Sequence, residues 1–109
     1  MRVAVLGGPR SLVETLGAST RLGGRFDVIV LFAPSQAMLE RRLGPALRAR
    51  NERGTLWLAW PKLSSGLATD LRESAVREIG LHTGLVDNKI CAVDETWSAL
   101  RFVARRRTP

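Results

Sequence analysis

The chain of 109 residues contains one cysteine, one histidine and no tyrosine. A single cysteine, Cys91, excludes an intramolecular disulfide and a metal site built from several cysteines. The longest apolar run, residues 28–33, is far shorter than the roughly 20 residues that a membrane-spanning helix requires. The N-terminal apolar run is broken at Gly7 and Gly8 and is too short for a signal peptide. We therefore expect a cytoplasmic protein that does not associate with membranes.

Lysine is also scarce, yet the net charge is +7, because Lys and Arg together number 17 against 10 Asp and Glu. Such a charge suits a polyanionic partner such as nucleic acid, but an arginine-rich composition is also typical of a GC-rich genome. No run of aromatic residues accompanies the arginines as a platform for stacked bases would, so nucleic acid is the less favoured partner. The candidate nucleic-acid-binding residues are Arg41, Arg42, Arg48, Arg50, Arg53, Arg105, Arg106 and Arg107.

Apolar, β-branched runs alternate with amphipathic stretches along the chain. They predict strands at residues 2–7, 26–33, 55–60, 89–94 and 99–105, with helices after the first, second and third strands. This order predicts an α/β, Rossmann-like sandwich of two or three layers. Its mostly parallel five-stranded sheet would end in a C-terminal antiparallel hairpin. We expect one domain, residues 1–104, and a basic tail, residues 105–109, that frays.

Local signals mark the helix boundaries. Ser11 with Glu14, and Asp70 with Glu73, have the spacing of a capping box at a helix start. Glu73 and Arg77 are placed to form an i, i+4 ion pair. The pair at residues 44–45, Gly-Pro, predicts a kink or a break in the second helix, because proline has no N–H to donate.

A ligand site in such a sheet lies beyond the carboxyl ends of the strands. The loops that leave those ends carry glycine, hydroxyl and charged side chains, which suit a small anionic or nucleotide-like ligand. The spacing matches neither a dinucleotide-binding fingerprint nor a phosphate-binding P-loop. The candidate ligand-binding residues are Gly8, Ser11, Ser35, Lys62, Ser64, Ser65, Asp94 and Trp97.

Groups suited to catalysis are few. His82 falls near the end of a helix and away from the predicted ligand edge, and Cys91 falls inside a strand as a small apolar residue. Asp94 and Glu95 sit in a tight turn, where carboxylates commonly bind backbone N–H groups. Trp97 either stacks on a planar ligand or covers the core, and we favour the cover. We expect no catalytic residue, metal ion or cofactor.

Several motifs resemble an uncharacterised bacterial family, catalogued as domain of unknown function 3052. They are the LW-x-x-x-PK pattern that begins at Leu56, a T-G-L triplet at residues 83–85 and W-S-x-x-R-F-V at residues 97–103. The resemblance covers roughly residues 26–104. No activity is established for that family, so the resemblance supports a fold.

The arrangement also resembles the later half of the class I methyltransferase fold, in which the last strand inserts between its two predecessors. This resemblance implies the strand order 1-2-3-5-4. Methyltransferases hold the ribose of their methyl donor with an acidic residue after the second strand, and this chain has no such strand.

Three functions remain open. A non-catalytic binding or protein-interaction module with a ligand at the sheet edge is the favoured one. A basic nucleic-acid-associated accessory protein and a degenerate methyltransferase-like enzyme are the alternatives.

Self-association is also expected. Right-handed crossovers would place the helices largely on one face of the sheet, while the strands are apolar on both faces. The bare face predicts a homodimer or a larger assembly.

Overall fold

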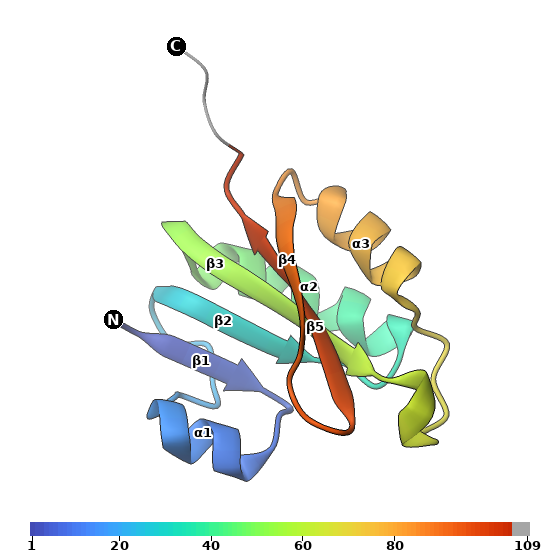
Figure 1. The fold of residues 1–109 in the computed structure, drawn as a ribbon. Coiled ribbons are helices and arrows are strands. Elements are labelled where there is room, and N and C mark those ends of the chain that lie inside the picture. Colours follow the sequence, from blue (N-terminus) through green and yellow to red (C-terminus); the bar gives the residue numbers. More distant parts are fainter. Residues whose placement is uncertain (106–109) are drawn as a thin grey trace.

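The computed structural model describes residues 1–105 and contains five strands and three α-helices there (Figure 1). The strands are β1 (Val3–Leu6), β2 (Phe26–Phe32), β3 (Arg50–Pro61), β4 (Val86–Ala92) and β5 (Trp97–Val103). The helices are α1 (Arg10–Leu16), α2 (Gln36–Ala49) and α3 (Glu73–Leu81), and a short 3-10 turn, η1, spans Leu63–Ser65. The predicted order of strands and helices is confirmed. Most of the predicted tail, residues 106–109, lies outside the described part.

The strands lie in the order β1-β2-β3-β5-β4, which is the order implied by the methyltransferase resemblance. β1 and β3 pair in parallel with β2, whereas β5 is antiparallel to both β3 and β4. The sheet is therefore mixed, and the expectation of a mostly parallel sheet is corrected. The reason is the position of β5: a reversed strand inside the sheet creates two antiparallel pairs, whereas one at the edge would create one.

The two faces of the sheet carry different cores. On the first face, α2 and α3 pack on alternate strand residues that include Ile29, Leu58 and Phe102. On the second face, Leu12 and Val13 of α1 join the cluster that contains Val30 and Phe32. Figure 1 shows the same division, with α2 behind the sheet and α1 in front of it. The layers are thus α2 with α3, the sheet, and the short α1.

The position of α1 differs from the expectation that the helices lie largely on one face. The cause is a step of the chain beyond β1. After α1, Ser19 lies alongside β1 on the edge that β2 does not occupy, with its N–H bonded to Val3 O at 2.9 Å and its C=O bonded to Val5 N at 2.8 Å. The chain therefore first moves away from β2. A right-handed crossover in that direction places its helix on the face opposite to α2.

Two predicted capping boxes do not form. α1 begins at Arg10 after Pro9, and α3 begins at Glu73 after Arg72; neither start has a side-chain cap. Asp70 is used elsewhere, because its Oδ1 accepts a hydrogen bond from the N–H of Gln36, at the start of α2, at 2.8 Å.

α2 is continuous through Pro45, so the predicted break is absent. Pro45 and Arg41, four residues earlier, are both exposed. The carbonyl of Arg41 that loses its partner can therefore bind water, which lowers the cost of the proline.

The first residues of the chain are tied to the start of β2. The carboxylate of Asp27 accepts hydrogen bonds from the backbone N–H of Arg2 at 2.7 Å and from the side-chain amide of Asn51 at 2.8 Å. The guanidinium of Arg2 lies 4.4 Å from the centre of the Phe26 ring. The bond from the Arg2 N–H and then the bond from Asn51 lower the pKa of Asp27 below its ordinary value of 3.8.

A second ion cluster joins α3 to β4. The Arg77 guanidinium contacts both Glu73 and Asp87 at 2.9 Å, which confirms the predicted pair with Glu73. Its hydrogen bonds to Asp87 and then to Glu73 raise the pKa of Arg77. Because these side chains are partly exposed, the cluster fixes the position of α3 more than it adds stability.

Two glycines inside helices predict opposite effects on stability. A Cβ on Gly80 would collide with the buried Phe102 ring, whereas a Cβ on Gly44 would meet only the end of Arg48, at 3.4 Å. Alanine favours a helix over glycine by about 0.5–1 kcal/mol, but overpacking a core costs about 1–3 kcal/mol. We expect Gly80→Ala to lower the urea midpoint and Gly44→Ala to raise it. An unchanged or higher midpoint for Gly80→Ala would contradict the close approach of α3 to Phe102.

The lowered pKa of Asp27 predicts a pH dependence of stability. A carboxylate whose pKa is lower in the folded state stabilises the fold above its unfolded pKa, and that contribution is lost as the pH falls through the folded pKa. We expect Asp27→Asn to lower the urea midpoint at pH 7 and to reduce the fall in midpoint between about pH 5 and pH 2. Glu14→Gln, an exposed carboxylate on α1, is the control. Equal pH profiles for the wild type and Asp27→Asn would contradict the assignment.

The homodimer stays a prediction. α1 covers only part of the second face, and Val28, Trp57 and Cys91 remain partly exposed there. Sedimentation velocity at low micromolar concentration measures the association. A compact monomer would contradict the homodimer and would show that α1 alone covers enough of the second face.

Candidate functional site

Four loops meet at one edge of the sheet. β4 runs in the same direction as β1, β2 and β3, because β5 is antiparallel to its two neighbours. The loops that follow β1, β2, β3 and β4 therefore leave the sheet together, at residues 7–9, 33–35, 62–72 and 93–96. This is the edge at which the sequence places its candidate ligand residues, and we refer to it below as the carboxyl edge.

Side chains pack closely against the two glycines that follow β1. Gly7 has φ +71°, and the guanidinium of Arg42 lies directly against it while donating a hydrogen bond to Phe32 O at 2.9 Å. A Cβ on Gly8 would come within 2.7 Å of both the Phe32 ring and Val5. The space over Gly7 and Gly8 is thus filled by side chains of β1, β2 and α2.

The turn between β4 and β5 is held together by Asp94. Its Oδ1 accepts hydrogen bonds from the N–H groups of Thr96 at 2.8 Å and Trp97 at 2.9 Å. The Trp97 ring packs edge-to-face on Phe32, with ring centres 5.1 Å apart and planes at 88°. Asp94 therefore shapes the turn, and Trp97 covers the second core. Asp94 and Ser11 also line a hollow of about 200 Å³ between α1 and this turn.

Ser35 and Ser65 bind neighbouring backbone. Ser35 is the N-cap of α2, where its hydroxyl accepts a hydrogen bond from Met38 N at 3.3 Å. The Ser65 hydroxyl donates to Lys62 O at 2.6 Å and accepts from Leu67 N at 3.2 Å, so it closes the turn after Lys62. Both serines organise the loops of the carboxyl edge.

A groove of about 370 Å³ lies beside Lys62, and we call it the Lys62 groove. It brings together two candidates from the sequence, Lys62 and Ser64, and its other lining residues are Trp60, Pro61, Leu63, Leu71, Arg72, Glu73 and Ser98. The Lys62 N–H donates to Thr96 O at 2.8 Å, which ties this loop to the β4–β5 turn. Of all the candidates, these two residues lie where aromatic, cationic and hydroxyl groups converge.

Sequence reasoning missed Arg72 and Ser98. Ser98 lies beside Trp60 because the two residues are cross-strand partners in β3 and β5. The predicted hairpin and strand order could have indicated Ser98, because they place the start of β5 next to the end of β3. Arg72 had no signal, because Asp70 was assigned to the helix start.

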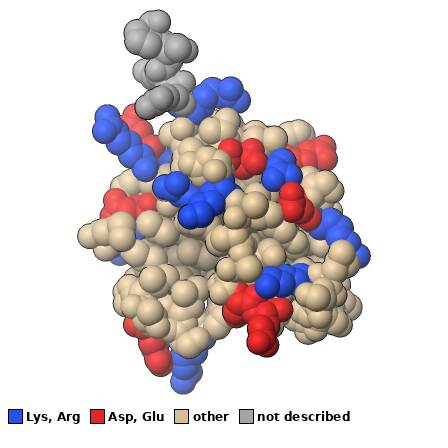
Figure 2. Space-filling model, in the orientation of Figure 1, with Lys and Arg blue, Asp and Glu red and all other residues tan. Residues whose placement is uncertain are grey.

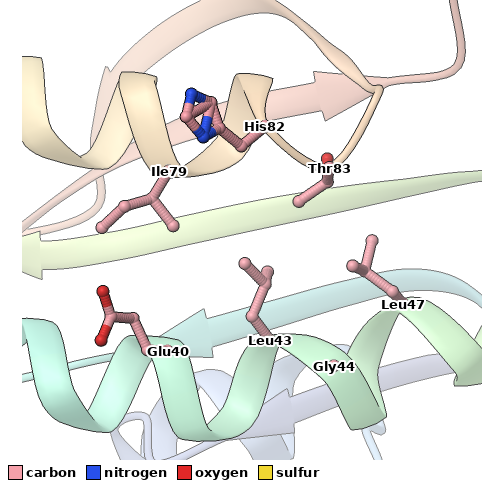
Figure 3. A pocket seen from close by; sticks show the side chains of 7 residues that line it. All are labelled: Glu40, Leu43, Gly44, Leu47, Ile79, His82 and Thr83. Carbon is pink, nitrogen blue, oxygen red and sulfur yellow. The ribbon is translucent and has the colours of Figure 1, made fainter.

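His82 lies in a different groove, between α2 and α3, of about 410 Å³. Figure 3 shows Leu43 and Leu47 pointing from α2 toward α3, with Ile79 pointing back at them. Glu40, His82 and Thr83 are the polar side chains at its margin. This groove is mainly apolar. His82 therefore lies away from the carboxyl edge, as the sequence predicted.

The candidate nucleic-acid-binding arginines are dispersed. Arg42 bonds to Phe32 O. One guanidinium nitrogen of Arg50 donates to three carbonyls at the start of β3, those of Asn51, Glu52 and Gly54, at 2.9–3.1 Å. The exposed members of the set are Arg41, Arg48, Arg53 and Arg105, while Arg106 and Arg107 lie outside the described residues. Figure 2 shows basic and acidic side chains interspersed around an uncharged middle on the face that carries α1.

Two further findings concern the described residues only. Within residues 1–105, no three His, Cys, Asp or Glu side chains are grouped so that they could hold a metal ion. None of the helices there has the length and apolar character needed to cross a membrane.

Comparison with known proteins places the fold. No family model matches the chain, and no curated protein is significantly similar to it, so the resemblance to the uncharacterised family stays an expectation. Among solved structures, the magnesium protoporphyrin IX methyltransferase of Synechocystis PCC 6803 with bound SAM matches with a TM-score of 0.58 and 16% identity over 88% of this chain and 52% of that chain.

Two other solved structures agree. The pyocyanin biosynthetic protein PhzM gives a TM-score of 0.60 at 12% identity over 95% of this chain and 43% of that one. A methyltransferase from Pyrococcus furiosus gives 0.52 at 20% identity over 86% and 54%. The chain thus has a methyltransferase-like fold and spans about half the length of the structures it matches.

Proposed function

We propose that this protein is a degenerate methyltransferase-like protein that binds a small anionic or nucleotide-like ligand at the carboxyl edge and does not transfer a methyl group. The Lys62 groove carries this proposal, because it combines an aromatic wall, two cations and two serines at the edge where open α/β sheets bind ligands. The proposal keeps the binding function that the sequence favoured. From the alternative of a degenerate methyltransferase-like enzyme it takes the fold and leaves out the enzyme activity.

The likeness to the methyltransferases supports the first part of the proposal. One of those structures holds SAM, and the strand order with a reversed strand inside the sheet was implied for this chain by resemblance to that fold.

The packing at the first loop supports the proposal that the protein does not transfer a methyl group. Arg42 lies over Gly7, and Phe32 lies against Gly8, so a ligand could not approach these glycines without displacing both side chains. The Lys62 groove, at the other end of the edge, is open to a ligand.

A ligand panel tests the proposal. Thermal unfolding is measured with S-adenosylhomocysteine, ATP, acyl-CoA and adenosine, and the consumption of SAM is followed separately. We expect ATP and acyl-CoA to raise the midpoint through their phosphates and uncharged adenosine to leave it unchanged, because a ligand that binds the folded state stabilises it. We expect SAM to remain intact.

Three results would overturn this function. If no member of the panel moves the midpoint, the binding function is wrong. If adenosine shifts the midpoint as much as ATP, the anionic character of the ligand is wrong. If SAM is converted to S-adenosylhomocysteine in the presence of a methyl acceptor, the protein is an active enzyme and not a degenerate one.

A further inference from the structure

The start of α3 offers backbone donors to the Lys62 groove. Arg72 is the N-cap and provides no side-chain cap, and the first helical bond runs from Val76 N to Arg72 O. Within residues 1–105, the N–H groups of Glu73, Ser74 and Ala75 have no acceptor. Arg72 and Glu73 line the groove, so this helix end, with its partial positive charge, forms one of its walls.

A buried indole adds an independent donor. Trp60 is 6% exposed and lines the same groove. Among the described residues, no acceptor is present for its N–H. The indole nitrogen is still in contact with solvent. Because this N–H reaches solvent and Trp60 lines the groove, it is a donor that a ligand in the groove could use.

Two cations complete the set. Lys62 lines the groove, and its ammonium forms no hydrogen bond or ion pair within residues 1–105. Arg72 donates from one guanidinium nitrogen to Leu71 O at 3.0 Å and, more weakly, to Thr69 O, which leaves its other nitrogens to a ligand. The acidic residue of the lining, Glu73, is paired with Arg77 at 2.9 Å.

We propose that the Lys62 groove is an oxyanion site: it binds a phosphate or carboxylate group with Lys62, Arg72, the Trp60 N–H and the first N–H groups of α3. The ligand carries this group on a flat apolar body. Trp60 and the exposed Leu63 supply apolar surface for that body, and the groove of about 370 Å³ is much larger than a phosphate ion. This inference rests on the proposed function and names the chemical group that the edge recognises.

Amide NMR of the full chain tests the site directly. The protein is titrated with phenyl phosphate, inorganic phosphate, benzoate and, for ionic strength, sodium chloride. We expect phenyl phosphate to shift the amide signals of Glu73, Ser74 and Ala75 and the indole signal of Trp60 in one saturable process. Inorganic phosphate should shift the same amides more weakly, since it lacks the apolar body, and benzoate shows whether a carboxylate suffices.

Matched variants separate the site from general charge effects. Lys62→Ala should weaken phenyl phosphate binding by about tenfold or more, the size of one charge-assisted hydrogen bond, and Arg72→Ala should weaken it as well. Lys89→Ala on β4 and Arg53→Ala on β3 remove the same charges from exposed positions outside the groove and should leave binding unchanged.

The outcomes distinguish this inference from the proposed function. Binding that shifts amides elsewhere on the edge, or that Lys62→Ala leaves intact, would overturn the oxyanion site while the ligand-binding function stands. Equal shifts with sodium chloride would show a nonspecific charge effect and also overturn the site. If no member of the thermal panel and none of these probes binds, the proposed function fails as well.

Discussion

The insertion of β5 between β3 and β4 is the constraint on which the rest of the structure depends. β5 pairs with β3 from Leu56↔Phe102 to Pro61↔Trp97 and with β4 from Val86↔Val103 to Ala92↔Ser98. It is therefore the strand that attaches β4 to the sheet. A slip of one residue would turn Phe102 and Leu100 away from α3 and expose them, so the register is enforced by burial. The same register brings Ser98 beside Trp60 and the β4–β5 turn beside Lys62, which creates the Lys62 groove.

β1 is the edge strand at one side of the sheet, and Ser19 partly covers its free side. β1 would expose a row of unpaired N–H and C=O groups, which promotes pairing with other chains. Ser19 satisfies two of these groups and acts as a strand of one residue, and its position also sends α1 to the second face. β4, at the other edge, is irregular between Asp87 and Lys89 and places a lysine there. Both edges thus carry features that limit further pairing.

Alternation of apolar residues was enough to predict the strands, the helices and, with the resemblance, the strand order. The missed details depend on contacts between distant residues. Asp70 follows the sequence rule for a capping residue, but in the fold its carboxylate accepts a hydrogen bond from Gln36 N at the start of α2. β3 begins at Arg50, five residues before the predicted start, because Arg50 pairs with Phe26. An irregularity separates that pair from the regular pairing that starts at Thr55, and the periodicity could not show it. The sequence predicted only that a ligand site lies at the carboxyl edge. The groove beside Lys62 depends on the register of β3 and β5, which the sequence did not predict.

The start of α3 at Arg72 is an unfavourable choice of residue for a helix N-cap. An Asp or Ser at the N-cap in place of Arg72 would stabilise α3 by about 1 kcal/mol, and the chain has Asp70 and Thr69 close by. Instead, Asp70 accepts a hydrogen bond from Gln36 N, and the Thr69 hydroxyl accepts from Leu71 N at 3.1 Å, so neither residue covers the end of α3. A cation at the N-cap opposes the partial positive charge of the helix end and is unfavourable by itself. The proposed oxyanion would bind Lys62, the remaining guanidinium nitrogens of Arg72, the helix end and the Trp60 N–H at once. The unfavourable N-cap residue and the neighbouring lysine are the physical basis of the site proposed at this groove.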